Sequence, residues 1–575
     1  MAVILAVLMT ICMFSPGLSI DSRGTSFITA FPENVAYYYK KSYNQLKITS
    51  LHEYTEVTVD MGEIRKKVIN ERGKTWILNF NKDLEEHRLT SSNMSVRITS
   101  DKDITVLSVS GWWGRFQSHV VQPDQNLGTA YQVPALNYTK LVASFSTVTN
   151  TEARYNSFRL LIINAVNESN TVTFKWVDES GENIENTTTL EAYNLFQLRS
   201  NSEVKEIKAT SKVAVLLTHP CVITQQPCSC NMVLNQLRHA NMTGNQDGKE
   251  SFFVPFTFNI LQLLLTTNQT VSINNGSEFS VEIKGPNSTD ILPSFPNISM
   301  GFVYNIDKPV SLQLISSGLI LDLIPKSMFA ACFLVHHHPS GSGALVIANK
   351  SEKGDVRINN QPLPSTINWK DMGRTGSQFS WTLVNLTVSS TIWHRTSKIA
   401  VYMIDRWDSD GKMPVYGGSA IIINADPDPN GCMVTPEMYI VGTNEMSWSK
   451  SHQYCFNKAD QFARLISTEN KNKFVTNMTM PSTAKNQGDG WISLRRDLLT
   501  TAWYWSSSKD NNKSNVVETF WDKGQPEKPE KGMCASVSLV ATESFNWKVA
   551  HCCSQKKPVC FNQTKYLDNV SDLTP

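Results

Sequence analysis

The sequence lacks the short motifs by which common enzymes are recognised. It contains no Gly-x-Ser-x-Gly elbow, no His-Glu-x-x-His and no phosphate-binding loop. Charged residues make up only 18% of the chain, the formal net charge is +2, and Lys and Arg do not cluster. A nucleic-acid partner would require such basic clusters. We therefore expect a protein that is not an enzyme and does not bind nucleic acid.

Long apolar runs are also missing after the first residues. Residues 1–14 are almost entirely apolar, and residues 15–19 supply the small side chains that precede a cleavage site. This pattern predicts a secretory signal peptide over residues 1–19. No later run approaches the ~18 apolar residues of a membrane span, and residues 568–575 are too polar for a lipid-anchor tail. We expect a secreted, extracellular protein without a membrane span.

Acceptor sequences for N-glycosylation are frequent, as in secreted glycoproteins. The Asn-x-Ser/Thr candidates are Asn93, Asn137, Asn167, Asn186, Asn241, Asn268, Asn275, Asn287, Asn297, Asn349, Asn385, Asn477, Asn512, Asn562 and Asn569.

The chain has 11 cysteines, of which Cys12 lies in the expected signal peptide. An even number remains, which favours disulfides in an oxidising compartment. One cluster is formed by Cys221, Cys228, Cys230 and Cys332, and we interpret it as a disulfide cluster with three possible pairings. The Cys228-Ser-Cys230 spacing is too short for the usual Cys-x₂-Cys zinc motif, so no metal site is expected there.

Residues 20–425 show little helical periodicity. Short runs of β-branched and aromatic residues alternate with Asn, Gly, Ser and Asp turns, which is typical of sandwich-type β domains. A sequence motif recurs at 96–108, 205–217, 303–315 and 392–404. It consists of a strand, a polar turn and a second, more apolar strand. Aligning Ile104, Val213, Val310 and Ile399 gives spacings of 109, 97 and 89 residues. We predict tandem β-sandwich-like units at about 20–128, 129–255, 256–340 and 341–425.

Two further patterns lie in this region. A second sequence motif, at 160–174, 264–273 and 344–358, indicates a β-hairpin at the start of a unit. The run His336-His337-His338 does not suit a metal, because neighbouring strand residues point to opposite faces. We interpret it as a solvent-exposed strand end.

The same region resembles the N-terminal domain of the IgG-Fc-binding protein family of secreted, mucus-associated proteins. The resemblance is carried by Gly111-Trp-Trp-Gly114, 128–134, His219-Pro-Cys221, 228–231 with Gln236-Leu237, and Phe253-Val-Pro255. It covers about residues 27–350. The chain departs from the family at 238–243, where Arg-His-Ala-Asn-Met-Thr replaces the usual Pro and Trp-Gly step. Antibody binding cannot be carried over to any residue here.

A Pro-rich linker at 426–431 precedes a different module at 432–565, and 566–575 is a polar tail. The module carries apolar residues at helical spacing over 447–465, a second helix starting at 469–475, and tryptophans framed by cysteines. Trp491-Ile-Ser-Leu494 is similar to the core strand of the C-type lectin-like domain. We therefore expect a chain that is mainly β with a C-terminal α+β domain.

The lectin resemblance implies specific bridges. The family pattern pairs Cys455 with Cys560 and Cys534 with Cys552, because Cys552 stands eight residues before Cys560, as the family's third cysteine usually does. Cys432 and Cys553 remain unassigned. They could pair with each other or link two chains.

Sugar binding in this family usually requires Ca²⁺, which takes six to eight oxygen ligands. The loop that would supply some of them reads Gln525-Pro526-Glu527, close to the galactose-type version. Lys548 and Val549 replace two oxygen donors, and Gly532 replaces the glutamate that usually stands two residues before the second cysteine. We expect no cofactor and disfavour calcium. The loop acids could instead pair with Lys528, Lys531 or Lys548.

We expect a secreted recognition protein that binds glycans or glycoproteins without calcium, and the two resemblances imply a role in innate immunity or mucosal defence. The candidate ligand-binding residues are Gln525, Pro526, Glu527, Lys548 and Trp505, with no catalytic residue and no metal ligand. Two alternatives remain open: a structural mucus or extracellular-matrix component, and a calcium-dependent galactose-type lectin. A disulfide-linked or non-covalent oligomer is possible for each.

Overall fold

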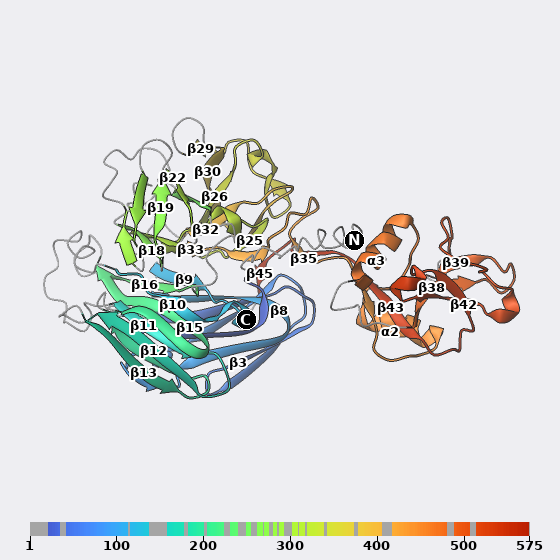
Figure 1. The fold of residues 1–575 in the computed structure, drawn as a ribbon, viewed down its shortest axis with the longest axis horizontal. Helices are drawn as coiled ribbons and strands as arrows, with labels where there is room; N and C mark the ends of the chain where they lie inside the picture. The colour runs from blue at the N-terminus through green and yellow to red at the C-terminus, as the bar shows by residue number, and fades with distance from the viewer. Residues whose placement is uncertain are drawn as a thin grey trace, which may run out of the picture. The chain divides into compact units, whose positions relative to one another are not determined.

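The structure is a computed structural model. It describes residues 21–34, 42–112, 115–136, 158–177, 182–200, 204–223, 230–239, 249–254, 262–267, 269–274, 280–284, 287–291, 302–308, 310–316, 319–338, 342–372, 378–404, 417–479, 488–506 and 513–573. The chain divides into two compact units, Met1–Cys432 with Leu567–Pro575, and Met433–Tyr566 (Figure 1). The expected class, mainly β with a C-terminal α+β domain, is confirmed. No helix in the described ranges is long and apolar enough to cross a membrane.

The larger unit begins with a nine-stranded sheet. Its strands, in order, are β4 (Ile64–Ile69), β3 (Thr55–Asp60), β8 (Ser95–Trp112), β2 (Ser42–Ser50), β5 (Lys74–Phe80) and β45 (Ser571–Asp572), joined by β1 (Gly24–Pro32), β6 (Glu85–Glu86) and β9 (Arg115–Val120). Alternate side chains enter the core, as the period of a strand requires. In β3, for example, Val57 and Val59 are fully buried.

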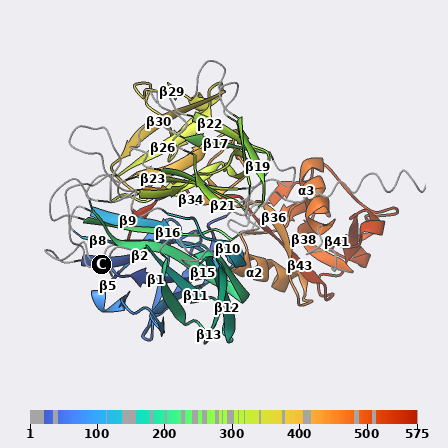
Figure 2. The same cartoon turned by 60° about the vertical axis from the view of Figure 1, so that its left-hand side comes forward.

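An eight-stranded sheet follows in the chain (Figure 2). It runs β13 (Asn183–Leu190), β12 (Asn170–Val177), β15 (Val204–Ile223), β11 (Phe158–Asn164), β14 (Leu195–Ser200) and β7 (Ser91–Ser92), with β10 (Gly128–Gln132) and β16 (Cys230–Gln236) also paired to β15. Strand β11 is buried on both faces. Leu160 and Ile162 face one core, while Leu161 and Ile163 pack with Ile28 of β1. The first two sheets therefore share apolar contacts.

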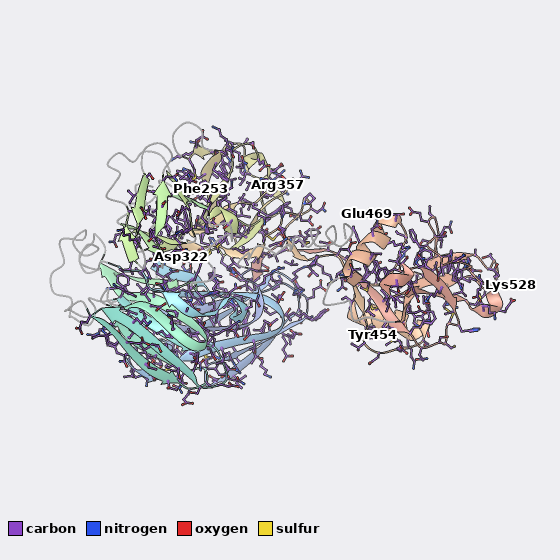
Figure 3. All side chains as sticks on the ribbon, viewed as in Figure 1. Phe253, Asp322, Arg357, Tyr454, Glu469 and Lys528 are labelled. Carbon is purple, nitrogen blue, oxygen red and sulfur yellow. A yellow bond between two sulfur atoms is a disulfide. The ribbon has the colours of Figure 1, made fainter. Side chains whose placement is uncertain are left out.

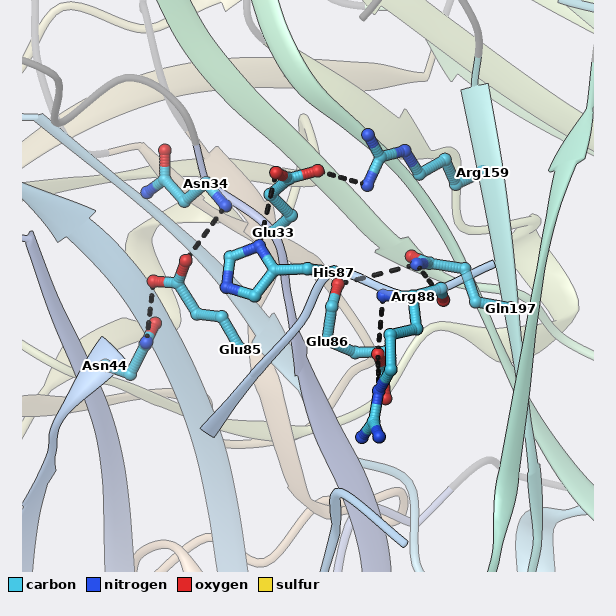
Figure 4. Close-up of polar contacts among 9 residues, drawn as sticks. All are labelled: Glu33, Asn34, Asn44, Glu85, Glu86, His87, Arg88, Arg159 and Gln197. Atoms are coloured by element: carbon cyan, nitrogen blue, oxygen red, sulfur yellow. Dashed lines mark hydrogen bonds and ion pairs between the residues drawn. The ribbon is translucent and has the colours of Figure 1, made fainter. Parts of the chain in front are cut away.

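A polar network around the buried pair Glu33–Arg159 also joins these two sheets (Figure 4). Glu33 and Arg159 are almost fully buried and lie 2.5 Å apart, and Nδ1 of His87 lies 3.2 Å from the other oxygen of Glu33. Burial alone would raise the pKa of Glu33, but the hydrogen bond with His87 and the charge of Arg159 lower it to about 2. Gln197 of β14 donates to the backbone carbonyls of Glu86 and Arg88.

The third and fourth parts of the unit each contain two sheets. The third comprises β17 (Glu250–Val254), β22 (Phe302–Ile306), β19 (Val271–Asn274) and β20 (Ser280–Ile283), then β21 (Asn287–Asp290), β18 (Gln262–Thr267), β23 (Ser311–Ser316) and β24 (Leu319–Asp322). The fourth comprises β28 (Gln361–Pro362), β27 (Val356–Ile358), β31 (Ser390–His394), β25 (Cys332–Val335) and β34 (Ile421–Asn424), then β29 (Lys370–Asp371), β30 (Phe379–Leu386), β26 (Ser342–Asn349), β32 (Ala400–Ile404) and β33 (Gly417–Ser419). One core contains Phe252 and Leu265 from the third part and Trp381 and Tyr402 from the fourth.

These pairings shift two of the expected unit boundaries. Strand β17 pairs with β22 and so belongs with the third part, although the boundary was expected at 255. Strand β25 pairs with β31 and β34 and so belongs with the fourth part, ahead of the expected boundary at 340. Sequence motifs indicate where strands lie, but strand pairing decides to which sheet each strand belongs.

The first repeated sequence motif, at 96–108, 205–217, 303–315 and 392–404, adopts two different structures. In its first two copies the polar stretch is not a turn, because β8 and β15 continue through it as strands of 18 and 20 residues. In the last two copies the chain breaks into β22 and β23, and into β31 and β32. The second sequence motif, at 160–174 and 264–273, does not form a hairpin, because β11 and β12 each pair with β15, and β18 and β19 lie in different sheets.

The interpretation of His336–His338 as exposed was wrong. His336 is only 3% exposed, and its Nε2 lies 3.3 Å from the hydroxyl of Thr49 in β2. Nζ of Lys47 donates to the carbonyl of His337 at 2.8 Å, and Nε2 of His338 lies 2.7 Å from the hydroxyl of Tyr43. His336 is buried, and His337 and His338 are half-buried, because the run packs against the first sheet, a contact that local periodicity does not encode.

The C-terminal segment is not a free polar tail. Leu567 and Val570 are buried, and Ser571–Asp572 form β45, which runs parallel to β5. Gly73 permits this approach, because its φ is +78° and a Cβ there would lie 2.0 Å from the carbonyl oxygen of Asn569. The chain therefore leaves the larger unit after Cys432 and rejoins it at Leu567.

The smaller unit, Met433–Tyr566, is α+β. A two-stranded sheet pairs β35 (Met433–Thr435) with β44 (Lys565–Tyr566). The main sheet contains β36 (Met438–Val441), β43 (Lys557–Asn562), β38 (Asp489–Arg496), β39 (Trp503–Ser506) and β40 (Lys513–Asn515), with β37 (Gln461–Phe462), β41 (Cys534–Ser538) and β42 (Trp547–Ala550). Two helices, α2 (Trp448–Lys458) and α3 (Thr468–Thr479), occur where the sequence predicted them, but α2 ends before the short strand β37.

Short 3₁₀ turns complete both units. They are η2 (Lys82–Leu84), η3 (Asp124–Asn126), η7 (Lys326–Met328), η8 (Lys353–Asp355), η9 (Pro529–Lys531) and η10 (Ala541–Glu543).

Candidate functional site

Two disulfides frame the smaller unit. Cys455 of α2 bonds to Cys560 of β43, with their Cα atoms 5.1 Å apart, and Cys534 of β41 bonds to Cys552, with Cα atoms 5.2 Å apart. These are the two pairings that the lectin resemblance implied. The first fixes a helix to the sheet, and the second closes the segment that follows the Gln525 loop.

The assignment of Cys332 to a cluster with Cys221, Cys228 and Cys230 was wrong. Cys332 bonds to Cys432, 100 residues away, with Cα atoms 5.5 Å apart. Cys332 begins β25, whose neighbour β34 leads the chain toward Cys432, so sheet pairing brings together two cysteines that are distant in sequence. The side chains of Cys221, Cys228 and Cys230 lie outside the described residues. Cys553 is a free, exposed cysteine, so the suggested Cys432–Cys553 pair is not formed.

Trp505 is a core residue and not a ligand contact. It is 1% exposed and packs edge to face against Trp547, with ring centroids 5.4 Å apart. Its neighbour Trp503 is only half-buried and lies 4.7 Å from Trp521. Alternation along β39 turns Trp505 inward and leaves Tyr504 partly exposed. Trp503, Tyr504 and Trp521 are partly exposed aromatic side chains of this unit.

The loop Gln525-Pro526-Glu527 is exposed at Pro526 and Glu527, and its Gln525–Pro526 bond is cis. The side chain of Gln525 is used within the protein. Its Oε1 accepts the backbone N–H of Val549 at 2.9 Å, and its Nε2 donates to Oε1 of Glu527 at 3.2 Å. The loop is thus attached to β42 through the amide that the sequence suggested as a ligand.

Arg496 supports the same loop from beneath. It is 5% exposed, donates from Nη2 to the carbonyl of Glu527, and places its guanidinium 4.7 Å from the ring centroid of Trp503. The sequence interpretation missed this residue. The signal was present, because Ile492 and Leu494 are core residues and alternation along β38 turns Arg496 the same way.

Lys548 does not pair with the loop acids. Its Nζ lies 2.5 Å from Glu543 and 3.5 Å from Asp489, which also pairs with Lys556 at 2.7 Å. The hydrogen bond to Glu543 raises the pKa of Lys548. Figure 3 labels Lys528, which lies at the exposed loop beside η9, well away from Glu469 on α3. Neither Lys528 nor Lys531 forms an ion pair within the described ranges of this unit.

The residues do not fit a calcium ion at this loop. A cation would require oxygen ligands where Lys548 and Val549 stand. Gly532 has a φ of +151°, and a Cβ there would lie 2.3 Å from the carbonyl oxygen of Ala550. A glutamate side chain therefore cannot be accommodated at this position without a shift of the backbone. Across the described ranges, no group of three or more His, Cys, Asp or Glu side chains is arranged to hold a metal.

Comparison with known proteins gives a match for each unit. The Lectin C-type domain family matches residues 444–562. Human IgGFc-binding protein is 24% identical over 395 residues, a match that covers 65% of this chain and 7% of that protein. This chain thus corresponds to a small part of a much longer relative.

Two solved structures are also similar to part of this chain. A calcium-independent type II antifreeze protein is 17% identical and covers 23% of this chain and 98% of its own, with a TM-score of 0.19. The mouse scavenger receptor C-type lectin carbohydrate-recognition domain is 18% identical and covers 23% of this chain and 91% of its own, also with a TM-score of 0.19. The chain combines a region related to IgGFc-binding protein with a C-terminal C-type lectin domain.

Proposed function

We propose that this chain is a secreted recognition protein whose lectin domain binds glycans or glycoproteins without calcium. The proposal rests on the contacts within and around the loop Gln525-Pro526-Glu527. Gln525 is hydrogen-bonded to Val549, Lys548 is paired with Glu543 and Asp489, and Gly532 has no room for a side chain. This arrangement holds the loop by internal contacts where relatives that bind sugar through calcium would need an ion.

The contact surface that we propose is aromatic and basic. Trp503, Tyr504 and Trp521 are partly exposed near the loop, and Tyr and Trp supply large, rigid faces with low loss of conformational entropy on binding. The domain is also basic, with 17 Lys and Arg against 12 Asp and Glu over residues 433–566. A partner with acidic groups, such as a sialylated or sulfated glycoprotein, suits that charge.

The larger unit supports a role in mucosal defence only by its relationship to IgGFc-binding protein. We propose no antibody-binding residue and no catalytic activity. The proposed place of action is extracellular, in agreement with the disulfides Cys332–Cys432, Cys455–Cys560 and Cys534–Cys552.

The test is a glycan array probed with the full chain in calcium and again with a chelator. We expect the same binding in both, weakened by Trp521→Ala and unchanged by Leu499→Ala, since Leu499 is 93% exposed on another loop. Binding that disappears with the chelator would favour a calcium-dependent lectin. Absence of binding to every glycan would favour a structural component of mucus or matrix.

A further inference from the structure

Among the strands that the structure describes, β13 is an edge strand of the eight-stranded sheet. It runs from Asn183 to Leu190 and pairs only with β12 among the described strands. Residues Ile184 to Thr187 are exposed. An exposed edge of this length presents unpaired backbone N–H and C=O groups, which can pair with a strand of another molecule.

The composition of β13 does little to prevent such pairing. Three consecutive threonines, 187–189, favour an extended backbone, and the strand contains no proline and one charged residue, Glu185. Its apolar residue Ile184 is 36% exposed. Charges and prolines are the usual protection of an edge, and β13 has only one charge and no proline.

An acceptor sequence for N-glycosylation, Asn186-Thr187-Thr188, lies in the middle of the strand. The side chain of Asn186 is exposed, and its Oδ1 accepts only the neighbouring N–H of Thr187, at 2.8 Å. The amide nitrogen is therefore accessible. By contrast, Asn477 in α3 is 9% exposed and its Oδ1 accepts the N–H of Tyr439 at 2.7 Å, so this fold leaves no space for a glycan at Asn477.

The register shows what a glycan at Asn186 would cover. Asn186 lies directly opposite Phe174 of β12, and Ile184 lies opposite Trp176. Residues opposite each other have Cβ atoms about 5 Å apart and share one face of the sheet. Phe174 is 4% exposed and belongs to the core. A glycan on Asn186 would therefore lie at the rim of that core, over Ile184.

Other acceptor sequences occupy similar places. Asn93 directly follows β7, the strand at the opposite end of the same sheet, and Asn569 precedes β45 at the end of the nine-stranded sheet. Both side chains are exposed. Asn287 begins β21, the outermost strand of a four-stranded sheet. These three sequons lie in or next to outer strands of their sheets.

We propose that Asn186 carries an N-linked oligosaccharide that covers the free edge of β13 and prevents edge-to-edge association between molecules. The donor is an oligosaccharide linked through its C1 to a polyprenyl pyrophosphate. Its C1–O bond breaks and a bond from C1 to Nδ2 of Asn186 forms, while the amide proton and the polyprenyl pyrophosphate leave. The inference rests on the proposed secretion, since this chemistry belongs to the secretory compartment.

The experiment uses the full chain secreted from eukaryotic cells. Glycopeptide mass spectrometry measures occupancy at Asn186 and at Asn167, an exposed sequon in the turn between β11 and β12. Size-exclusion chromatography with light scattering then compares Asn186→Gln with the control Asn167→Gln. We expect occupancy at both sites and an oligomer fraction at least about threefold larger for Asn186→Gln.

Two further samples keep the test independent of folding failure. Thr188→Ser keeps the acceptor sequence and should behave as the unaltered chain, and native enzymatic deglycosylation of the folded chain should reproduce the oligomers. Occupancy at Asn167 without occupancy at Asn186 overturns the inference, as does equal oligomer content in the two Gln variants. If no sequon is occupied, the proposed secretion fails together with this inference.

Discussion

Gly532 provides the strictest test of the lectin domain, because the family pattern places a glutamate there. Its φ of +151° and ψ of 158° lie in a region open almost only to glycine, and a Cβ would approach the carbonyl oxygen of Ala550 to 2.3 Å. Restoring the acid by Gly532→Glu should therefore damage the domain instead of creating a calcium site.

The expected magnitude has two parts. Forcing a non-glycine residue into such a conformation costs about 1–3 kcal/mol. The overlap is with backbone atoms, which cannot rotate away, so the total should reach at least about 3 kcal/mol for Gly532→Ala and for Gly532→Glu. Gly524 supplies the matched control in the same loop. Its φ is +83° with nothing within 4 Å of a Cβ, so Gly524→Ala should cost only about 1–2 kcal/mol.

The assay is thermal and denaturant unfolding followed by the fluorescence of the buried tryptophans, together with calorimetric titration of calcium. Both Gly532 variants should unfold well before Gly524→Ala and should show no calcium binding. The reasoning would be refuted if Gly532→Ala were as stable as Gly524→Ala, or if Gly532→Glu bound calcium and became more stable on binding.

Four further predictions follow from the same contacts. Trp505→Ala should destabilise the lectin domain by about 3–5 kcal/mol because Trp505 is 1% exposed, whereas Trp503→Ala should cost much less in the same unfolding assay. Arg159→Met removes the guanidinium that lies 2.5 Å from the buried carboxylate of Glu33 and should cost about 3–5 kcal/mol, while Glu33→Gln combined with Arg159→Met should recover much of the loss in a double-mutant comparison. Burial lowers the pKa values of His119, His219 and His338 to about 3, whereas the same imidazoles in the unfolded chain bind protons below about pH 6.5. The melting temperature of the larger unit should therefore fall as the pH decreases from 6.5 toward 3. A melting temperature that does not change with pH over this range would contradict the prediction. If disulfide-linked dimers form, Cys553→Ser should abolish them on a non-reducing gel, because Cys553 is the free cysteine among the described residues.

Much of the lectin domain was predictable because its signals are local or fixed by family spacing. Trp491, Trp547 and the four framing cysteines identify the core and its bridges, and the resemblance named the Gln525 loop. The sequence did not show that Trp505, a candidate ligand-binding residue, is buried. Alternation along β39 decides that it faces inward, and the start of that strand was unknown.

The larger unit shows the opposite balance. Its β character was evident from composition, but the repeated sequence motif could not show that its first two copies form continuous strands, β8 and β15. The partner of Cys332, the burial of His336 and the return of Ser571–Asp572 to the first sheet all depend on contacts between residues far apart in the chain.

The sequence by itself determined the β-rich class, because that depends on residue type and short spacing. The resemblance to the C-type lectin-like domain then implied the C-terminal module, its two bridges and the loss of calcium-ligand side chains. The tertiary structure alone decided which strands pair, which cysteine meets Cys432, and which side chains of the Gln525 loop are consumed by internal hydrogen bonds. The physical reason is that backbone pairing and burial are properties of the assembled sheets. A strand carries the same residues whether it lies at an edge or at the centre, and only its neighbours decide what those residues can bind.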